Sequence, residues 1–462
     1  MRHPEHLQIV TDLVTKFKDI KDHIINDIIP TLSSTPVFII TSIPPTGLIL
    51  TLPGIYRLTN NIDWYPDPDV IAITIIGSDI TLDLNCKSII NHNYVFNVIG
   101  ILIAVSNNIT IYNGSLVNPG SSGIITLLSN NVTISNLSIC QLTNNNLSLP
   151  SFAMLAAESS NITITNNIIS NIDVIGNVLS AIALISCQYI TITNNNINKI
   201  LNRAGVCSGI SFISCAYANT CQINISDLST GTMSNDNAPG HTAIGLVPTQ
   251  SSNLYFSNCV GCNILGGCDD AHFISLYWVT NCTVDSCRCS SIIDGTSGKG
   301  AKATGFEVYG IRDVSNANII VRNCLAENIK ATNPGDKQAA GFSVAGSGIT
   351  IANCTAKNVI VCGSGSEPGF GVGFGWAPDI RAINIYVANN VTYDNCTAKD
   401  CQIGFDTFNH SNSRWICPKM IDCCENFAPF VAEKIYYCDK CSECPQGSTY
   451  VRVVNMAWNN RC

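Results

Sequence analysis

Charged residues are scarce in this sequence of 462 residues. Asp, Glu, Lys and Arg together make up 12% of the chain, about half the share that is typical of soluble proteins. They leave a net charge of -8, whereas proteins that bind nucleic acid usually carry a basic patch or stripe. We therefore expect no nucleic-acid partner. The hydrophobic share of 46% excludes intrinsic disorder and supplies a large core.

Long uninterrupted hydrophobic runs are also missing. A membrane-spanning helix needs about 20 mostly apolar residues. Residues 28–56 carry no charge, but five prolines exclude a continuous helix there. Charged residues interrupt residues 7–29 from Asp12 onward, so the start of the chain lacks the apolar core of a secretory signal peptide. We expect neither a membrane span nor such a signal.

Cysteine, in contrast, is abundant, with 24 residues. An even number suits a disulfide framework in an oxidising compartment. Reduced cysteines can instead pack as small hydrophobic residues. Because no secretion signal accompanies the cysteines, both interpretations stay open.

A short phrase recurs through the middle of the chain. It runs Asn, then an apolar residue, Thr, Ile or Val, any residue, and Asn, and its closing residues lie 23 to 42 positions apart. That spacing is typical of stacked repeats. The alternation of β-branched residues predicts a short strand, and Asn at each end suits a left-handed turn. Copies are Asn108–Asn113, Asn131–Asn136, Asn161–Asn166 and the looser Tyr189–Asn194.

A second phrase built on Gly and Phe lies between these copies, so each repeat holds at least two strands. Its copies are Gly209–Phe212, Gly305–Val308, Gly341–Val344, Gly373-Phe374 and Gly404-Phe405. A short pair of strands cannot bury its own apolar face, but stacked coils can. Coils about 4.8 Å apart would align equivalent Asn side chains into ladders and stack Cys, Ile and Phe inside.

This pattern resembles the right-handed parallel β-helix of the pectin-lyase-like superfamily. The segments Leu52–Leu58 and Ile80–Asn85 are similar to the first coils of such proteins, and the resemblance covers roughly residues 37–410. It implies an all-β solenoid, but lyases, hydrolases, adhesins and viral fibres share this fold. The Asn-, Ile- and Cys-rich style also resembles the β-helix repeat proteins of giant DNA viruses.

We expect three segments, which are residues 1–36, a β-helix over residues 37–414, and a Cys-rich closing segment over residues 415–462. A heptad seam predicts an amphipathic helix over residues 5–29. The seam residues are Val10, Leu13, Phe17, Ile20 and Ile24. The helix would either cap the first coil or join chains as a short coiled coil.

The closing segment holds seven cysteines that are candidates for disulfides. They are Cys417, Cys423, Cys424, Cys438, Cys441, Cys444 and Cys462. The spacing of Cys438, Cys441 and Cys444 is also similar to that of metal-cluster ligands, although it lacks the fourth cysteine of a bacterial ferredoxin. Disulfides, a zinc site and free thiols therefore remain open.

One stretch, residues 88–157, contains no Asp, Glu, Lys or Arg. Solenoid surfaces are normally charged, and charged residues are depleted at the cores of interfaces. This uncharged belt either packs against sister chains or is simply a neutral soluble face.

Acids that could cleave a polysaccharide are few. Asp269 and Asp270 follow two glycines, and a Gly-His pair lies upstream. Polygalacturonases, which share the β-helix fold, use a double Asp before a Gly-His-Gly, so the order here is wrong and the match is weak. Glu307 and Asp406 both follow Gly-Phe, and we expect both to point outward, each as an ordinary exposed charge or as a member of a local ion pair. Three coils would separate them by about 14 Å, too far for a catalytic carboxylate pair.

Aromatic residues gather near the end of the repeats. Rings along a solenoid could bind sugars, but they could equally fill the interior of the last coils. The cluster comprises Trp376, Tyr386, Tyr393, Phe408 and Trp415.

The sequence thus predicts an all-β chain, a right-handed parallel β-helix that needs no cofactor. We hypothesise a structural surface or fibre protein, a rigid shaft that forms homo-oligomers, belongs to a virion or an extracellular surface, and binds a carbohydrate ligand. The alternatives are a polysaccharide lyase or glycoside hydrolase, and a cell-surface adhesin.

Overall fold

The computed structural model describes residues 35–436 except for 94–96, 143, 145, 147–149, 232–241, 268–269, 295–301, 310–316, 333–337, 363–369, 376–387, 407–409, 412, 424 and 428–434. The chain divides into two compact units. Unit 1 comprises Met1–Ile197 and Phe212–Asn219, and unit 2 comprises Asn198–Ser211 and Thr220–Cys462. The predicted helix over residues 5–29 lies outside the described residues. No helix in the described part of the chain is long and apolar enough to cross a membrane.

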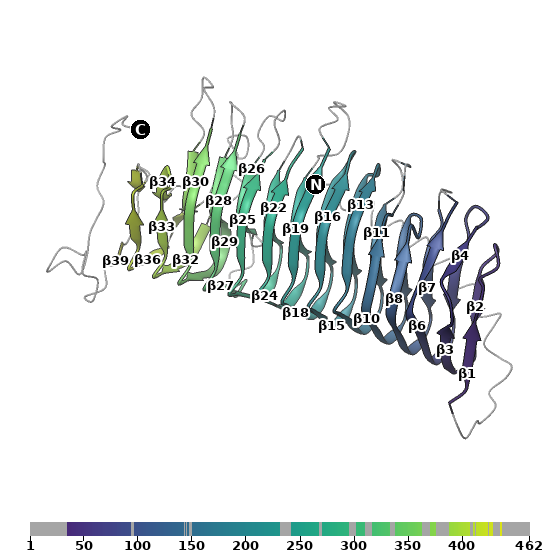
Figure 1. The fold of residues 1–462 in the computed structure, drawn as a ribbon. Helices are drawn as coiled ribbons and strands as arrows, with labels where there is room; N and C mark the ends of the chain where they lie inside the picture. Colours follow the sequence, from purple (N-terminus) through teal and green to yellow (C-terminus); the bar gives the residue numbers. More distant parts are fainter. Residues whose placement is uncertain are drawn as a thin grey trace. The chain divides into compact units, whose positions relative to one another are not determined.

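The strands of unit 1 form two parallel sheets, which we name sheet A and sheet B (Figure 1). Sheet A contains β1 (Val37–Ile40), β3 (Gly54–Leu58), β4 (Ile62–Trp64), β6 (Ser78–Asn91), β8 (Asn107–Val117), β10 (Asn130–Cys140), β12 (Ser160–Thr165), β13 (Ile168–Val174) and β15 (Gln188–Thr193). Sheet B contains β2 (Leu48–Leu50), β5 (Ile71–Ile75), β7 (Ile99–Ala104), β9 (Ser122–Leu127), β11 (Ser151–Ala157) and β14 (Val178–Ile185).

Unit 2 repeats this arrangement. Sheet B strands are β20 (Ala243–Thr249), β23 (Ala271–Tyr277), β26 (Lys302–Tyr309), the first half of β29 (Gln338–Ala352), β31 (Phe370–Gly375), β34 (Ile403–Phe405) and β38 (Glu425–Phe427). Sheet A strands are β19 (Asn224–Thr230), β21 (Ser252–Ser257), β22 (Val260–Leu265), β24 (Thr280–Asp285), β25 (Arg288–Ile293), β27 (Ile319–Arg322), β28 (Leu325–Ala331), β30 (Thr355–Val361), β32 (Ala388–Asp394), β33 (Thr397–Lys399), β35 (His410–Ser411), β36 (Arg414–Ile416), β37 (Lys419–Ile421) and β39 (Ile435–Tyr436). Strands β16 (Asn196–Asn202), β17 (Val206–Ile213) and β18 (Ala216–Cys221) contain residues of both units.

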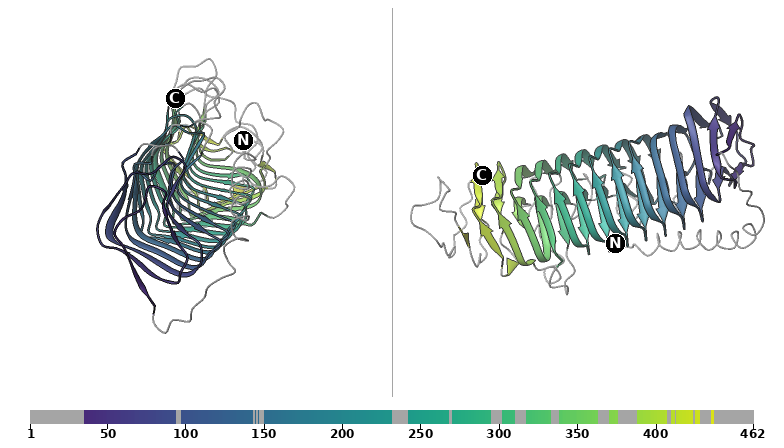
Figure 2. Two further views of the ribbon diagram at one scale, coloured as in Figure 1. Left: turned by 90° about the vertical axis from the view of Figure 1, so that its right-hand side faces the viewer. Right: turned by 90° about the horizontal axis from the view of Figure 1, so that it is seen from below.

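Within each unit, the described strands of successive coils pair in parallel register. In unit 2, β23, β24 and β25 pair with β26, β27 and β28 respectively, so one coil holds three strands. Figure 2 shows the strands of successive coils running in the same direction within each unit. Each unit is therefore built from coils of a right-handed parallel β-helix, the fold that the sequence predicts. The segment bounds at residues 36 and 414 stay predictions.

Asparagine forms the corners between strands, as the repeated phrase predicts. Both Asn residues of a copy have a positive φ, which is 55° at Asn131 and 53° at Asn136. Asn tolerates this left-handed conformation because its short side chain bonds the local backbone. The side chains also form the predicted ladders. Asn131 donates its Nδ2 to Asn108 Oδ1 at 3.0 Å, and Asn108 donates to Asp79 Oδ1 at 2.9 Å.

A phenylalanine column fills the interior of unit 2. Phe306, Phe342, Phe374 and Phe405 stack in register, with ring centroids 4.8, 4.8 and 5.1 Å apart. All four are at most 1% exposed. The glycine before Phe342 is required, since a Cβ at Gly341 would lie 2.6 Å from the Cβ of Ala356. The Gly-Phe phrase thus marks one interior row of the β-helix.

Buried cysteines donate to the same kind of carbonyl pair as buried asparagines do in other coils. Asn195 Nδ2 donates to the carbonyl two residues earlier and to Ile164 O of the preceding coil. Cys354 donates its thiol to the matching pair of carbonyls, at 3.2 and 3.6 Å. In the described part of the chain, buried cysteines such as Cys187, Cys259 and Cys354 are free thiols. The interpretation of cysteine as a small core residue therefore holds for this part of the chain.

Candidate functional site

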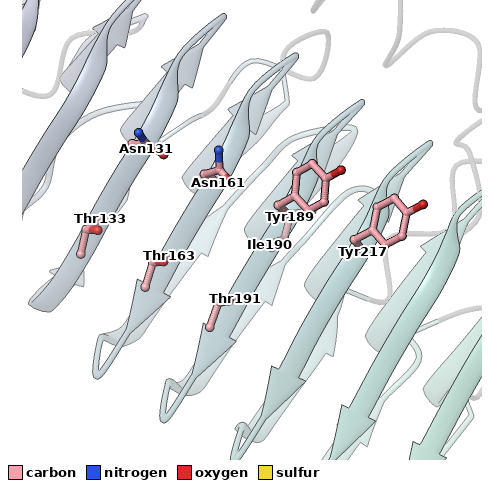
Figure 3. Close-up of a pocket in the computed structure, with 8 residues that line it drawn as sticks. All are labelled: Asn131, Thr133, Asn161, Thr163, Tyr189, Ile190, Thr191 and Tyr217. Carbon is pink, nitrogen blue, oxygen red and sulfur yellow. The ribbon is translucent and has the colours of Figure 1, made fainter.

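Unit 1 presents an open groove on the outer face of sheet A, which we name the tyrosine groove. It has a volume of about 490 Å³. Its lining residues are Asn131, Thr133, Asn161, Thr163, Tyr189, Ile190, Thr191 and Tyr217. Figure 3 shows two lines of side chains across adjacent strands, one of Asn and Tyr at the corners and one of Thr on the strands.

The repeat itself builds both lines. Thr133, Thr163 and Thr191 are register partners on β10, β12 and β15, so their hydroxyls recur at one coil spacing, about 4.8 Å. The corner line begins with Asn131 and Asn161, and Tyr takes over the corner position at 189 and 217. Tyr189 and Tyr217 keep the left-handed conformation, each with φ 57°.

The two tyrosines form an exposed stacked pair. Their ring centroids are 5.2 Å apart, with an interplanar angle of 10°. Tyr189 is 54% exposed and Tyr217 is 52% exposed. A large exposed apolar side chain is unusual only where such side chains gather, and here two gather beside a row of hydroxyl and amide groups. None of the lining residues carries a charge at neutral pH.

Unit 2 carries a different feature on sheet B, which we name the acid–histidine cluster. It comprises Asp270, His272, Ser275, Tyr277, Lys302, Glu307 and Tyr309, from β23, β26 and the residue before β23. Ser275 is the register partner of Glu307, and Tyr277 is the partner of Tyr309. Adjacent coils therefore bring these side chains together.

Glu307 is the centre of this cluster. Its Oε2 accepts hydrogen bonds from Ser275 Oγ at 2.5 Å and from Tyr277 OH at 2.8 Å. The ring of Tyr277 stacks on Tyr309 at 5.1 Å. Glu307 is 2% exposed, so the expectation of an ordinary exposed charge at this position is wrong. The outer face of sheet B is covered here, and donors from the neighbouring coil replace water around the carboxylate.

His272 lies between two carboxylates. Its Nδ1 is 3.5 Å from Glu307 Oε2, and its Nε2 is 3.6 Å from Asp270 Oδ2. Burial alone would lower the pKa of His272, but the charges of Glu307 and Asp270 outweigh burial and raise that pKa above its ordinary value. Burial also opposes ionisation of Asp270, yet the bond to His272 holds the pKa of Asp270 below its usual range.

Tyr277, Tyr309 and Lys302 are the remaining members of the acid–histidine cluster. Burial and the charge of Glu307 raise the pKa of Tyr277 and of Tyr309 well above ordinary values, so both stay neutral donors. Lys302 places its Nζ 3.4 Å from Tyr309 OH, and its backbone N–H donates to Asp270 Oδ1 at 2.7 Å. Asp270 is the more exposed of the two acids, with 22% of its side chain exposed.

The structure brings two of the four predicted acids together. Asp270 and Glu307 come together around His272, whereas Asp269 lies outside the described residues. Asp406 follows β34 in the same slot as Glu307, because Phe306 and Phe405 belong to one column. Asp406 is 6% exposed, so it too is buried rather than an ordinary exposed charge, and its N–H donates to Phe374 O at 2.7 Å.

Only some of the predicted aromatic and cysteine residues lie in the described part of the chain. Tyr393 and Trp415 are each 1% exposed and stack on one another at 5.6 Å, so they fill the interior. Trp376, Tyr386 and Phe408 lie outside the described residues. Cys423 is a free thiol, and the disulfide prediction for Cys417 stays a prediction. The other candidates for disulfides or metal lie outside the described residues, namely Cys424, Cys438, Cys441, Cys444 and Cys462.

Sequence reasoning missed Tyr189, Tyr217 and His272. A signal for the tyrosines was present, because Tyr189 replaces the first Asn of an otherwise regular copy of the phrase. For His272 the signal was weaker. Only the register of β23 against β26 shows that the Asp-x-His of one coil meets the Glu of the next.

Comparisons with known proteins were made for the whole chain. No family model matches it, and no curated protein matches it. Among solved structures it is similar to the Dettilon tailspike protein, with 12% identity and a TM-score of 0.39, over 68% of this chain and 58% of that one. The chain thus spans less than two thirds of that protein.

Two further likenesses are to enzymes. One is the catalytic unit of a GH87 alpha-1,3-glucanase from Streptomyces thermodiastaticus, with 10% identity and a TM-score of 0.37, over 89% of this chain and 69% of that one. The other is the A-module of a mannuronan C-5 epimerase from Azotobacter vinelandii, with 10% identity and a TM-score of 0.32, over 82% and 89%. Likenesses this distant do not bear on the activity of this chain.

Proposed function

We propose that this chain is a glycan-binding surface protein in which the β-helix serves as a rigid scaffold and the tyrosine groove binds the carbohydrate. The observation that carries the proposal is the exposed stacked pair Tyr189 and Tyr217 beside a regular row of hydroxyl groups. Binding sites for small molecules typically combine an aromatic surface with a few placed polar groups. A sugar ring offers an apolar face to the tyrosines and hydroxyls to the polar rows.

The polar rows suit a chain of sugars rather than a single one. Thr133, Thr163 and Thr191 repeat the same hydroxyl at each coil, and each hydroxyl can donate and accept. Asn131 and Asn161 add amide groups along the same direction. Since no lining residue is charged, the groove favours a neutral glycan over an acidic one.

The regular stack of coils also bears on where the protein acts and how its chains associate. A stack of coils holds its surface groups in fixed register, which suits a shaft on a virion or an extracellular surface. We propose that sister chains associate along the uncharged belt, residues 88–157, because few charges there would need to lose water on association.

Calorimetric titration with neutral and acidic oligosaccharides tests the proposal. Neutral glucose, mannose and galactose oligomers serve as one set, and oligogalacturonate and oligomannuronate serve as the other. We expect a neutral oligomer to bind, and Tyr189→Ala or Tyr217→Ala to weaken that binding about tenfold, which corresponds to about 1.4 kcal/mol. Tyr65→Ala is the matched control, because Tyr65 is also exposed, at 58%, but lies outside the groove.

Failure of every oligomer to bind, or binding that both groove variants leave unchanged, would refute the proposed site. A preference for the acidic set would refute the neutral-glycan assignment.

A second candidate function is polysaccharide cleavage at the acid–histidine cluster. The observation that favours it is His272 between Asp270 and Glu307, whose negative charges raise the pKa of His272 above its ordinary value. Burial of Glu307 weighs against it, since a substrate would first have to reach the cluster. Release of product from any oligomer in the same panel, abolished by Asp270→Asn and by Glu307→Gln, would favour this function.

A further inference from the structure

Sheet B of unit 1 carries an apolar stripe on the face that points away from the interior. Its members contact one another across four neighbouring strands, β7, β9, β11 and β14. They are Leu102, Ala104, Ile125, Leu127, Phe152, Leu155, Ala157, Ala183 and Ile185. We name this set the sheet B stripe.

Two observations place the stripe on the outer face. All of its members come from sheet B, whereas the interior of a β-helix mixes side chains of both sheets. Residues alternate between the two faces of a strand, and on β7, β9 and β14 the stripe residues lie two positions apart. Leu102 and Ala104 belong to the stripe, while Ile101 and Ile103 on the same strand do not.

The stripe is nevertheless shielded from water within a single chain. Leu127 and Ala157 are 0% exposed, and Ile125 is 3% exposed. In unit 1 the structure does not describe residues 1–34 and eight further residues, which lie in short gaps between 94 and 149. The short gaps cannot cover four strands, which span about 14 Å. Residues 1–34, which belong to the same unit, are long enough to span these strands.

We propose that the N-terminal segment, residues 5–29, docks along the sheet B stripe as an amphipathic strap, rather than capping the first coil or forming a coiled coil between chains. Its apolar seam, Val10, Leu13, Phe17, Ile20 and Ile24, supplies the complementary surface. As a helix the segment would be about 37 Å long, enough to cross every strand of the stripe. The polar residues between seam positions would then face water.

The proposal does not depend on the glycan function, because the stripe lies on sheet B and the tyrosine groove lies on sheet A. It assigns the segment a stabilising role. The stripe would otherwise expose contiguous apolar surface, which is an aggregation liability.

Photo-crosslinking in the full chain tests the strap. Phe17→p-benzoylphenylalanine places a crosslinker on the seam, and Lys18→p-benzoylphenylalanine is the matched position off the seam. After irradiation and proteolysis, mass spectrometry identifies the partner residues. We expect position 17 to crosslink within the same chain to β7, β9, β11 or β14, and position 18 to give these products at least several-fold less.

Three results would overturn the proposal. Crosslinks from position 17 to β1–β4 would mean a cap, crosslinks between chains would mean a coiled coil, and no crosslink would mean that the segment does not dock. A second measurement guards against a local effect of the crosslinker. Phe17→Asp should raise the fluorescence of an apolar dye several-fold with an unchanged far-ultraviolet spectrum, and Lys18→Asp should not. Equal dye binding by both variants would also contradict the strap.

Discussion

His272 illustrates how a buried polar residue is tolerated in this fold. It is 1% exposed, and an ionised group at such a position is costly unless partners compensate. The carboxylates of Asp270 and Glu307 supply that compensation from two coils. The stability of the folded protein therefore depends on whether His272 is protonated.

We predict that the stability of the protein falls as the pH rises from about 6.5 into the alkaline range. The pKa of His272 is raised in the folded state, so its contribution is complete below the ordinary pKa of about 6.5 and is lost as the pH rises through the folded value. Asp270, whose pKa is lowered, loses its contribution only when the pH falls through the acidic range. Tyr277 and Tyr309 stay neutral throughout this window, and Lys302 is the remaining cation.

Urea unfolding midpoints between pH 5.5 and 9 measure this effect. His272→Gln should lower stability at pH 6 by about 3–5 kcal/mol, because it leaves two buried carboxylates without a partner, and it should flatten the dependence on pH. His92→Gln is the control, because the side chain of His92 is 41% exposed. A wild-type midpoint that does not change with pH would contradict the role of His272.

At the scale of the element, the phenylalanine column ties neighbouring coils of sheet B together. Phe342 lies between Phe306 and Phe374, with interplanar angles of 4° and 3°. Each coil contacts mainly its neighbours in a solenoid, so damage should stay local.

We predict that Phe342→Ala costs about 3–5 kcal/mol, since it leaves a ring-sized cavity, and that Phe342→Leu costs less. Hydrogen–deuterium exchange with mass spectrometry should show faster exchange in β26, β29 and β31 and no change in β7–β11. Uniform acceleration over both units would contradict local stabilisation.

The elements also show where sequence patterns suffice. The Asn phrase predicts strands and corners because the left-handed conformation at positions such as Asn131 and Asn161 is a local property of the residue. The Gly-Phe phrase predicts the column because a missing Cβ at Gly341 and a ring at Phe342 recur in register. In contrast, alternation on sheet B does not reveal which outer residues are covered, so the pattern alone predicts an exposed charge at Glu307, which is in fact buried.

At the scale of the whole molecule, the uncharged belt is the feature that bears on assembly. Residues 88–157 carry no charged side chain. The belt contains most of the sheet B stripe and, on sheet A, Thr133 of the tyrosine groove. The remaining surface includes Ser115 and Ser138, which are register partners on the second half of β8 and β10.

We predict that the purified chain is a homo-oligomer and that Ser138→Arg dissociates it, because an arginine would have to lose water at the interface. Sedimentation equilibrium should give a multiple of the chain mass for the wild type and a lower mass for the variant. Ser290→Arg is the control, because Ser290 lies on β25, which continues the strand row of the second half of β10 outside the belt. A monomeric wild type would mean that the belt is a neutral surface.

The sequence by itself determined the coil architecture, the left-handed corners, the Asn ladders and the Phe column. Each of these depends on a residue's own conformational preference or on identical residues repeated at matching positions, so no knowledge of distant contacts is needed. The tertiary structure alone decided which unlike residues meet. The coils differ in length, and only their register brings Glu307 to Ser275, stacks Tyr189 on Tyr217, and gathers the sheet B stripe on one covered face.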